Sequence, residues 1–351
     1  MATSAISTTE IVYTPTGCTR LCSARCRITL RPIRFVVVLP ISACPKQMIP
    51  RFPAFKRLDI HDKREIQDFV RGFAPYSDFN FVTLVTCDVR GSVEVSYVNK
   101  NLAVRMHDYI TQEPFFTFIG TRDTFETAVA LLDHARDVGD RPILRLVPED
   151  VVDAMSHSAR EMLCIAPDPA SFDYIHSVTE FSSLSSPRLA KKRCAIRVFR
   201  TTHPETRIAV LNLLDPQSVA SIRAVLHAWR TDKQRTEKEV AAEFSAIERC
   251  LTLAPAIELV TLGAFLGSEL VAFTINEVVH DGFCMSHFGK ALPRYRGLCD
   301  FFEHETAKVM QRLGCDRMNF QQDLGLPGLR AYKRGWQPAG YLKKFTLELR
   351  S

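Results

Sequence analysis

The sequence lacks a hydrophobic run long enough to cross a membrane. The apolar run Phe35–Leu39, for example, stops at Pro40, whereas a spanning helix needs roughly 20 apolar residues. Paired cysteines are lacking as well, because none of the 11 cysteines stands in a Cys-x-x-Cys motif. We therefore expect no transmembrane segment, no metal site, and free thiols in a reducing compartment.

Acidic residues are nearly lacking from residues 1–50, where six Lys or Arg stand against the single acid Glu10 and give a net charge of +5. This Ser-, Thr- and Arg-rich composition is typical of an organelle transit peptide. The alternative is a disordered extension, with Met48 as the functional start. We expect a cytoplasmic protein, with an organelle as the alternative. The rest of the chain is nearly neutral, so a nucleic-acid or membrane partner would need a local basic patch.

Regularly spaced apolar residues predict helices and strands from residue 51 onward. The first half has one apolar helix stripe around Ile66–Phe73, predicted strands at Phe79–Thr86, Val93–Val98, Leu102–Arg105 and Phe115–Ile119, and a helix at Asp123–Val138. The second half has two helices (217–231 and 237–252), three strands within 256–288, a helix at Leu298–Leu313, a strand within 315–323, a helix at Leu326–Gly335 and a strand at Tyr341–Leu349. Asp281-Gly282 predicts a tight hairpin between two of these strands.

The order of elements in the second half resembles that of a GNAT acyltransferase domain, and the first half has a looser version of it. We therefore predict an α/β (α+β) chain of tandem GNAT-like domains, each a mixed, mostly antiparallel sheet flanked by helices. The predicted parts are a disordered or targeting extension over 1–50, an N-terminal domain over 51–190, and a C-terminal domain over 191–351 that carries the donor site.

The stretch "ALPRYRGLCDFFEHE" contains Arg294-x-x-Gly297-x-Cys299, which resembles the GNAT pattern Arg/Gln-x-x-Gly-x-Gly/Ala. A glycine loop that opens a helix exposes unpaired N–H groups to an anion, and Arg294 and Arg296 add charge-assisted bonds. We expect these arginines and Gly297 to bind donor phosphates. The alternative is a surface turn with two solvated arginines. The matching junction of the first half has one glycine, Gly120, and no basic cluster, so only the second half is expected to bind the donor.

The stretch "SSPRLAKKRCAIRVFR" is a basic strip without an acid. Its six basic residues are Arg188, Lys191, Lys192, Arg193, Arg197 and Arg200. On a helix, such a strip is expected to hold the phosphates of a tRNA 3′ end or a lipid headgroup, with Lys192 and Arg193 nearest the donor. The alternative is a solvated helix face or a linker.

The stretch "CDRMNFQQDLGLPGLRAYKRGW" has polar side chains at a predicted strand end, where sites in such sheets tend to lie. Asp323 or Glu303 is expected to orient or deprotonate the acceptor, with Gln321 beside them. The acceptor side is expected to be formed by Asn319, Gln322, Arg330 and Lys333. The alternative is that these groups only cap a strand and a helix.

Several stretches together are similar to the C-terminal domain family of phosphatidylglycerol lysyltransferase, over roughly Phe52–Leu347. They are "FKRLDIHDKREI", "PYSDFNF", "DYIHSVTEFSSLSSPRLAKKR", "GKALPRYRGL" and "MNFQQDLGLPGLRAYKRGWQP". The last is the most specific. Relatives usually read Asn-x-Glu-Gln-Asp-Leu-Gly there, with Glu at the position of Gln321.

The resemblance implies a tandem GNAT-like fold and transfer of an aminoacyl group from aminoacyl-tRNA to an acceptor amine or hydroxyl, without a covalent enzyme intermediate. No tightly bound cofactor is expected, and aminoacyl-tRNA or acyl-CoA would be the co-substrate. The expected partners are tRNA and a small-molecule, peptide or lipid-headgroup acceptor. The alternatives are a coenzyme A-dependent N-acyltransferase and a non-catalytic binding protein.

Overall fold

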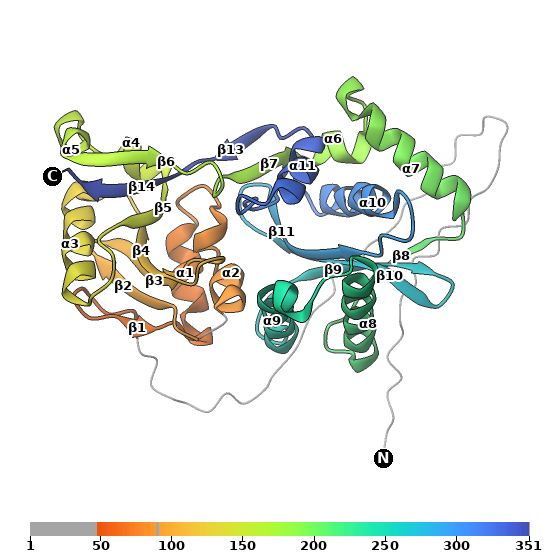
Figure 1. Ribbon diagram of the computed structural model, residues 1–351, viewed down its shortest axis with the longest axis horizontal. Coiled ribbons are helices and arrows are strands. Elements are labelled where there is room, and N and C mark those ends of the chain that lie inside the picture. The colour runs from red at the N-terminus through yellow and green to blue at the C-terminus, as the bar shows by residue number, and fades with distance from the viewer. Residues whose placement is uncertain (1–47, 89–90, 351) are drawn as a thin grey trace, which may run out of the picture. The chain divides into compact units, whose positions relative to one another are not determined.

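Figure 1 shows the computed structural model of the chain, which describes residues 48–88 and 91–350. The predicted extension therefore lies, up to residue 47, outside the described residues. Within the described ranges, no helix combines the length and the apolar character that a bilayer span requires. No three His, Cys, Asp or Glu side chains of these same ranges are placed to hold a metal ion.

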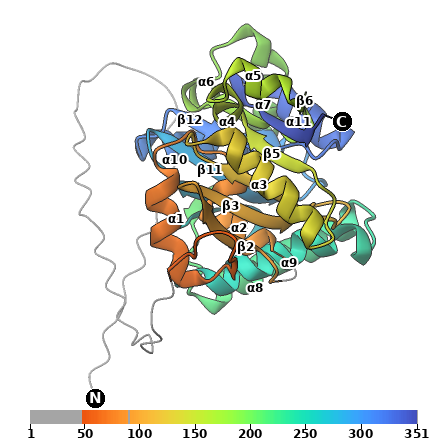
Figure 2. The same cartoon turned by 90° about the vertical axis from the view of Figure 1, so that its left-hand side faces the viewer.

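The first sheet has seven strands in the order β1-β2-β3-β4-β5-β14-β6. Its strands are β1 (Lys56–Arg57), β2 (Glu94–Val98), β3 (Asn101–His107), β4 (Pro114–Ile119), β5 (Leu144–Pro148), β6 (Leu163–Pro167) and β14 (Lys344–Leu349). The helices of this half are α1 (Lys63–Val70), α2 (Phe81–Cys87), α3 (Thr124–Asp137), α4 (Glu149–Asp153) and α5 (His157–Glu161), with short 3-10 turns at Ile60–Asp62 and Ser77–Phe79. Figure 2 shows α3 crossing the face of this sheet that is turned to the viewer.

The second sheet also has seven strands, in the order β13-β7-β12-β11-β10-β9-β8. Its strands are β7 (Asp173–Ser177), β8 (Arg207–Val210), β9 (Val260–Leu266), β10 (Glu269–Val278), β11 (Phe283–Ala291), β12 (Arg317–Asn319) and β13 (Gly340–Leu342). The helices are α6 (Val178–Ser183), α7 (Ala190–Thr202), α8 (Pro216–Asp232), α9 (Glu237–Leu253), α10 (Leu298–Arg312) and α11 (Pro327–Gly335), with a 3-10 turn at Pro187–Leu189. In Figure 1, α8 and α9 lie on one side of this sheet and α10 and α11 on the other.

The two sheets share one strand order and exchange one strand. Each sheet has six strands from one half of the chain and one strand from the other half. In the first sheet β14 lies between β5 and β6, and in the second sheet β7 lies between β12 and β13. All pairs are antiparallel except β4–β5 and β11–β12. The prediction of an α/β chain with two mixed, mostly antiparallel sheets flanked by helices is confirmed. The boundary between residues 190 and 191 stays a prediction, and each sheet takes one strand from beyond it.

Two predicted elements were wrong. Tyr341–Leu349 was predicted as one strand, but the chain passes from the second sheet to the first between Leu342 and Lys344. Phe79–Thr86 was predicted as a strand because of its β-branched and aromatic residues, yet helix α2 begins within it at Phe81 and runs to Cys87. Asn80 caps that helix by accepting a hydrogen bond from the Thr83 N–H. Since α2 is buried on nearly every side and packs on α9, it has no polar face to show helical spacing.

A buried ion cluster fastens the exchanged strands. Lys344, on β14, lies with its ammonium 2.7 Å from Asp173 Oδ1, on β7, and also contacts Asp78. All three residues are fully buried. Ser77 donates its hydroxyl to Asp173 at 2.6 Å. Burial raises the pKa of Asp78 despite the nearby lysine. The cluster therefore joins both sheets through groups that are costly to leave unpaired.

Candidate functional site

The second sheet opens where β11 and β12 part. These parallel strands pair only over Phe283–Met285 and Arg317–Asn319. Beyond that point β11 continues to Ala291, whereas β12 ends. The gap is spanned by a side chain, because Gln321 Nε2 donates to the Ser286 carbonyl at 3.1 Å. An opening at the carboxyl ends of such strands is a usual place for a site.

A bulge in β11 marks the same point. Ile275 of β10 faces Phe288, but its neighbour Asn276 faces Ser286, so His287 is the extra residue. A bulge re-aims the side chain it adds. The His287 side chain is only 1% exposed. It therefore points into the molecule, at the start of the opening.

His287 belongs to a polar cluster that sequence reasoning missed. Its Nε2 lies 3.2 Å from Glu277 Oε2, and its Nδ1 lies 3.3 Å from Gln321 Nε2. Asn80, the cap of α2 in the first half, donates to the same Glu277 oxygen at 2.7 Å. A signal for this cluster was present in the sequence. Glu277 and His287 stand a few residues before and after the Asp281-Gly282 turn, and a hairpin brings such residues together.

The predicted donor loop is covered by α7. Gly297 is the N-cap of α10 and has a φ of +84°. A Cβ on Gly297 would lie 2.3 Å from the Ala195 carbonyl oxygen. Arg294 makes a bidentate ion pair with Asp232 at 2.8 and 3.0 Å, while Arg296 is exposed. The structure thus brings these three residues to one helix end, where α7 of the same chain packs against Gly297.

Half of the basic strip is used to dock α7. Lys192 lies 2.7 Å from Asp300 and 4.7 Å from the centre of the Trp336 ring. Arg193 donates to the carbonyls of Leu184 and Ser186, at 2.6 Å each. Arg200 pairs with Glu305 at 2.9 Å. The remaining three, Arg188, Lys191 and Arg197, are exposed.

Glu303 lies between α10 and α11 with one oxygen engaged. Tyr332 donates its hydroxyl to Glu303 Oε1 at 2.8 Å, and the hydroxyl also lies 3.6 Å from Cys299 Sγ. The other oxygen, Oε2, is buried and has no hydrogen-bond partner among the described residues. Burial raises the pKa of Glu303 to about 7. This carboxyl can therefore exchange a proton near neutral pH.

Asp323 is fully engaged and fully buried. It accepts two hydrogen bonds from Arg330 at 2.8 and 3.0 Å, one from the Tyr174 hydroxyl at 2.7 Å and one from the Gly325 N–H at 2.8 Å. Burial alone would raise the pKa of Asp323, but these hydrogen bonds outweigh it and lower the pKa. A carboxylate held in this way is a weak base and a strong anchor.

The other acceptor-side candidates fasten the chain around the end of β12. Asn319 donates to the Pro75 carbonyl at 2.8 Å, and Gln322 donates to Asp78 at 3.0 Å. The buried ammonium of Lys333 reaches three successive carbonyls, of Phe320, Gln321 and Gln322. Burial lowers the pKa of Lys333 to about 7. Of the residues predicted here, only Gln321 reaches the opening between β11 and β12.

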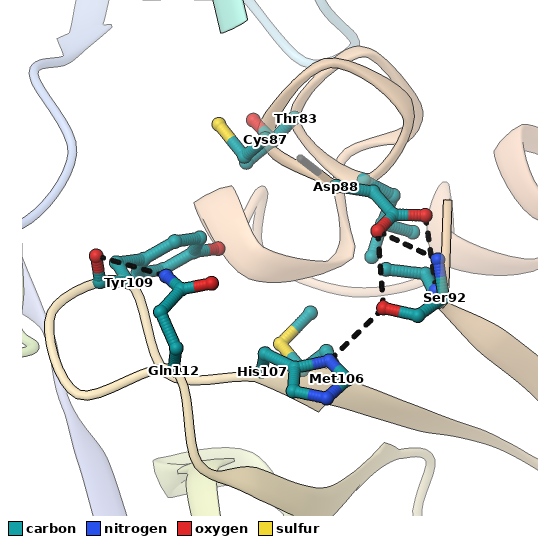
Figure 3. Close-up of a pocket in the computed structure, with 10 residues that line it drawn as sticks. Thr83, Cys87, Asp88, Ser92, Met106, His107, Tyr109 and Gln112 are labelled. Carbon is teal, nitrogen blue, oxygen red and sulfur yellow. Dashed lines mark hydrogen bonds between the residues drawn. The ribbon is translucent and has the colours of Figure 1, made fainter. Parts of the chain in front are cut away.

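A small pocket in the first half lies beside α2 and β3 (Figure 3). Ser92 Oγ lies 3.0 Å from His107 Nδ1 within it. Asp88 accepts from the Ser92 N–H at 2.8 Å and is 3.4 Å from its hydroxyl. The carboxylate thus faces the serine rather than the imidazole, which differs from the order of a nucleophile, a base and an orienting acid. The sequence had pointed to no site here.

Comparison with known proteins gives one family and one fold. The model of the family described as phosphatidylglycerol lysyltransferase, C-terminal, matches residues 71–348. A solved conserved protein of unknown function from Bacteroides thetaiotaomicron has a TM-score of 0.75 at 20% identity, over 86% of this chain and 100% of that one. The C-terminal domain of a putative lysylphosphatidylglycerol synthetase from Agrobacterium fabrum has a TM-score of 0.58 at 13% identity, over 82% and 92%. For L-PGS from Bacillus licheniformis the values are 0.56 at 12%, over 87% and 94%.

No curated protein matches the chain. At such low identities, the likeness to solved structures establishes the fold alone. The family model, in contrast, covers most of the sequence and includes the motif around Gln321 and Asp323. The resemblance seen in the sequence is confirmed, and the chain belongs to the phosphatidylglycerol lysyltransferase C-terminal family.

Proposed function

We propose that the chain is an acyltransferase that moves an aminoacyl group from aminoacyl-tRNA to an acceptor amine or hydroxyl. The observation that carries this proposal is the parting of β11 and β12, where a partly buried side chain, Gln321, spans the gap. A side chain can be displaced by a reacting group, whereas a paired strand cannot. Family membership supports the choice of an aminoacyl group.

The closed loop at Gly297 favours aminoacyl-tRNA over coenzyme A. A pyrophosphate at the N-terminus of α10 would compete with the Ala195 carbonyl, and Arg294 is already paired with Asp232. A tRNA needs no such cradle, because its phosphates can meet an exposed basic surface. Arg188, Lys191 and Arg197 on and beside α7 offer one.

The reaction needs no enzyme-bound intermediate. The ester carbonyl of the donor would lie in the opening, and the acceptor would attack it directly. Glu303, on α10, has a carboxyl group whose raised pKa lets it exchange a proton near neutral pH. Asp323 is assigned to holding the loop that follows β12, because Arg330 and Tyr174 occupy it.

The test is discharge of radiolabelled aminoacyl-tRNA by the full chain, with each of the twenty charged tRNAs and with amine and hydroxyl acceptors. We expect discharge of at least one tRNA that depends on the acceptor, and no such discharge with any of the twenty would refute the proposal. Acetyl-CoA serves as the competing donor. The triple variant Arg188→Gln, Lys191→Gln, Arg197→Gln should raise the KM for tRNA and flatten its dependence on salt.

A further inference from the structure

We propose that the acceptor is a primary amine and that His287 is the general base that takes its proton, with Glu277 and Asn80 as positioning residues. This inference rests on the proposed acyl transfer. It does not require a particular donor.

The first step of the argument is the tautomer of His287. Glu277 Oε2 lies 3.2 Å from Nε2, and a carboxylate can only accept a hydrogen bond. The proton of the neutral ring is therefore on Nε2, and Nδ1 carries the free electron pair. Gln321 Nε2, an amide donor, lies 3.3 Å from Nδ1, which agrees with this assignment.

The second step of the argument is that the NH₂ group of Gln321 occupies the place where the NH₂ group of an acceptor amine would bind. The NH₂ group of Gln321 has two hydrogens, and it has two acceptors, the Ser286 carbonyl at 3.1 Å and His287 Nδ1. A primary amine presents the same two hydrogens, whereas a hydroxyl presents one. An amine that displaces the amide would satisfy both acceptors. A hydroxyl would leave one of them unpaired in a largely buried place, which costs free energy.

The third step is the position of the base relative to the opening. His287 is the bulged residue of β11, and pairing with β12 ends two residues earlier, at Met285. Its Nδ1 lies beside the gap in which the donor carbonyl is proposed to sit. Gln321 is only partly buried, so the group that covers Nδ1 is itself within reach of solvent.

The chemical step balances without a further reactant. The amine nitrogen bonds to the ester carbonyl carbon as His287 Nδ1 accepts one of its protons. Glu277 stabilises the imidazolium through Nε2. The bond from the carbonyl carbon to the ribose oxygen of the tRNA then breaks, and the imidazolium returns the proton to that oxygen. The products are an amide and uncharged tRNA.

The two halves of the chain meet at this group. Asn80, at the N-terminus of α2, donates to Glu277 at 2.7 Å and fixes the carboxylate that orients the ring. Asn80 is buried, as is Glu277. The first half thus acts on the reaction through Asn80, although it has no donor motif of its own.

The variants separate a base from a merely structural group. His287→Gln keeps most of the side-chain volume and cannot act as a base near neutral pH; His287→Ala is the second variant if the first does not fold. We expect kcat to fall roughly 100-fold or more, as is typical for loss of a general base. Glu277→Gln should lower kcat roughly 10-fold or more, and the KM for the donor should stay unchanged. A purely structural role would instead lower the melting temperature and disturb both constants.

His280 provides a matched control on the same hairpin. Its Nδ1 lies 3.1 Å from the exposed Asp281, so it is also a histidine beside an acid, but away from the opening. His280→Ala should leave kcat unchanged. Gln321→Ala should lower the KM for the amine, because the amide no longer competes for Nδ1 and the Ser286 carbonyl.

The acceptor class is tested with matched pairs: propylamine and propanol, a lysine-containing and a serine-containing peptide, and vesicles of phosphatidylethanolamine and of phosphatidylglycerol. Each is offered with charged tRNAs and with acetyl-CoA as donor. Transfer only to amine members, abolished by His287→Gln, is the expected result. Transfer only to hydroxyl members, or transfer that survives both His287 variants, would overturn the inference.

The donor outcome is read separately. Transfer from acetyl-CoA alone that depends on His287 would refute the tRNA donor and leave the base and the amine in place. Transfer from tRNA that does not depend on His287 would support tRNA as the donor and refute His287 as the general base. No transfer from any donor to any acceptor would overturn the proposed function and this inference together.

Discussion

The Ala195 carbonyl oxygen lies directly over Gly297, at a place where a Cβ would approach it to 2.3 Å. Helix α7 thereby covers the N-terminus of α10, and ion pairs of Lys192 with Asp300 and of Arg200 with Glu305 hold it there. The loop for which the sequence suggests phosphate binding is thus also a contact between two helices of the same chain.

Gly297→Ala is expected to destabilise the protein because the new methyl group meets the Ala195 carbonyl and because its φ is +84°. Gly314→Ala is the matched control, since Gly314 has a φ of +86° and nothing within 4 Å of a Cβ. The difference between the two, measured by urea unfolding, should be roughly 1–3 kcal/mol. Equal losses would show that α7 does not press on Gly297 in solution.

Lys344→Met is expected to cost roughly 3–5 kcal/mol of unfolding free energy, because it leaves Asp78 and Asp173 buried without their cation. The neighbouring Lys343 is a control, since it is largely exposed and pairs with Glu149 on the surface. Lys343→Met should unfold at the same urea concentration as the wild type. Similar midpoints for both variants would contradict a role for the ion cluster in holding the exchanged strands.

The spacing of apolar residues and the turn motif predicted those elements that depend on residues close together in the sequence. The stripes of α8 and α9 and the Asp281-Gly282 turn appear where the sequence placed them, with shifts of a few residues. The exchange of β14 for β7 has no local signal, because it places Lys344 beside Asp173 and Asp78, which lie far from it in the sequence. A pattern of alternating residues looks the same in either sheet.

The candidate site was predictable in part for the same reason. The motif around Gln321 was recognised from its residues, and Gln321 does lie at the opening. His287 carried no recognisable spacing, because a bulge shifts it out of the alternation that strand patterns assume. The pairing of Asp323 with Arg330, seven residues on, depends on how the Gly-Leu-Pro-Gly turn folds back, which composition does not specify.

Asp323→Asn is expected to lower stability by roughly 1–3 kcal/mol, since Arg330 and Tyr174 lose a charged acceptor. The pKa of Asp323 is lowered in the folded protein, so its contribution is present above the ordinary pKa of Asp and is lost as the pH falls through the lowered value. The difference from the wild type should therefore shrink in acid. Asp316→Asn, at an exposed position just before β12, is the control. A large loss of kcat with an unchanged melting temperature would instead identify Asp323 as a catalytic residue.

Glu303→Gln is expected to stabilise the protein at pH 8 and not at pH 5. Burial raises the pKa of Glu303 to about 7 in the folded state, against about 4.3 in an unfolded chain. Between these values the folded state binds more protons, so this group makes stability fall as the pH rises towards 7. Glutamine cannot ionise, and the variant should gain roughly 1–3 kcal/mol over the wild type at pH 8, measured by urea unfolding at both pH values.

Glu305→Gln, which loses its bonds from Arg200 and Lys308, should show no such gain. A difference between Glu303→Gln and the wild type that is the same at both pH values would mean that Glu303 is already ionised at pH 5, and that the carboxyl on the α10 side of the sheet exchanges no proton near neutrality.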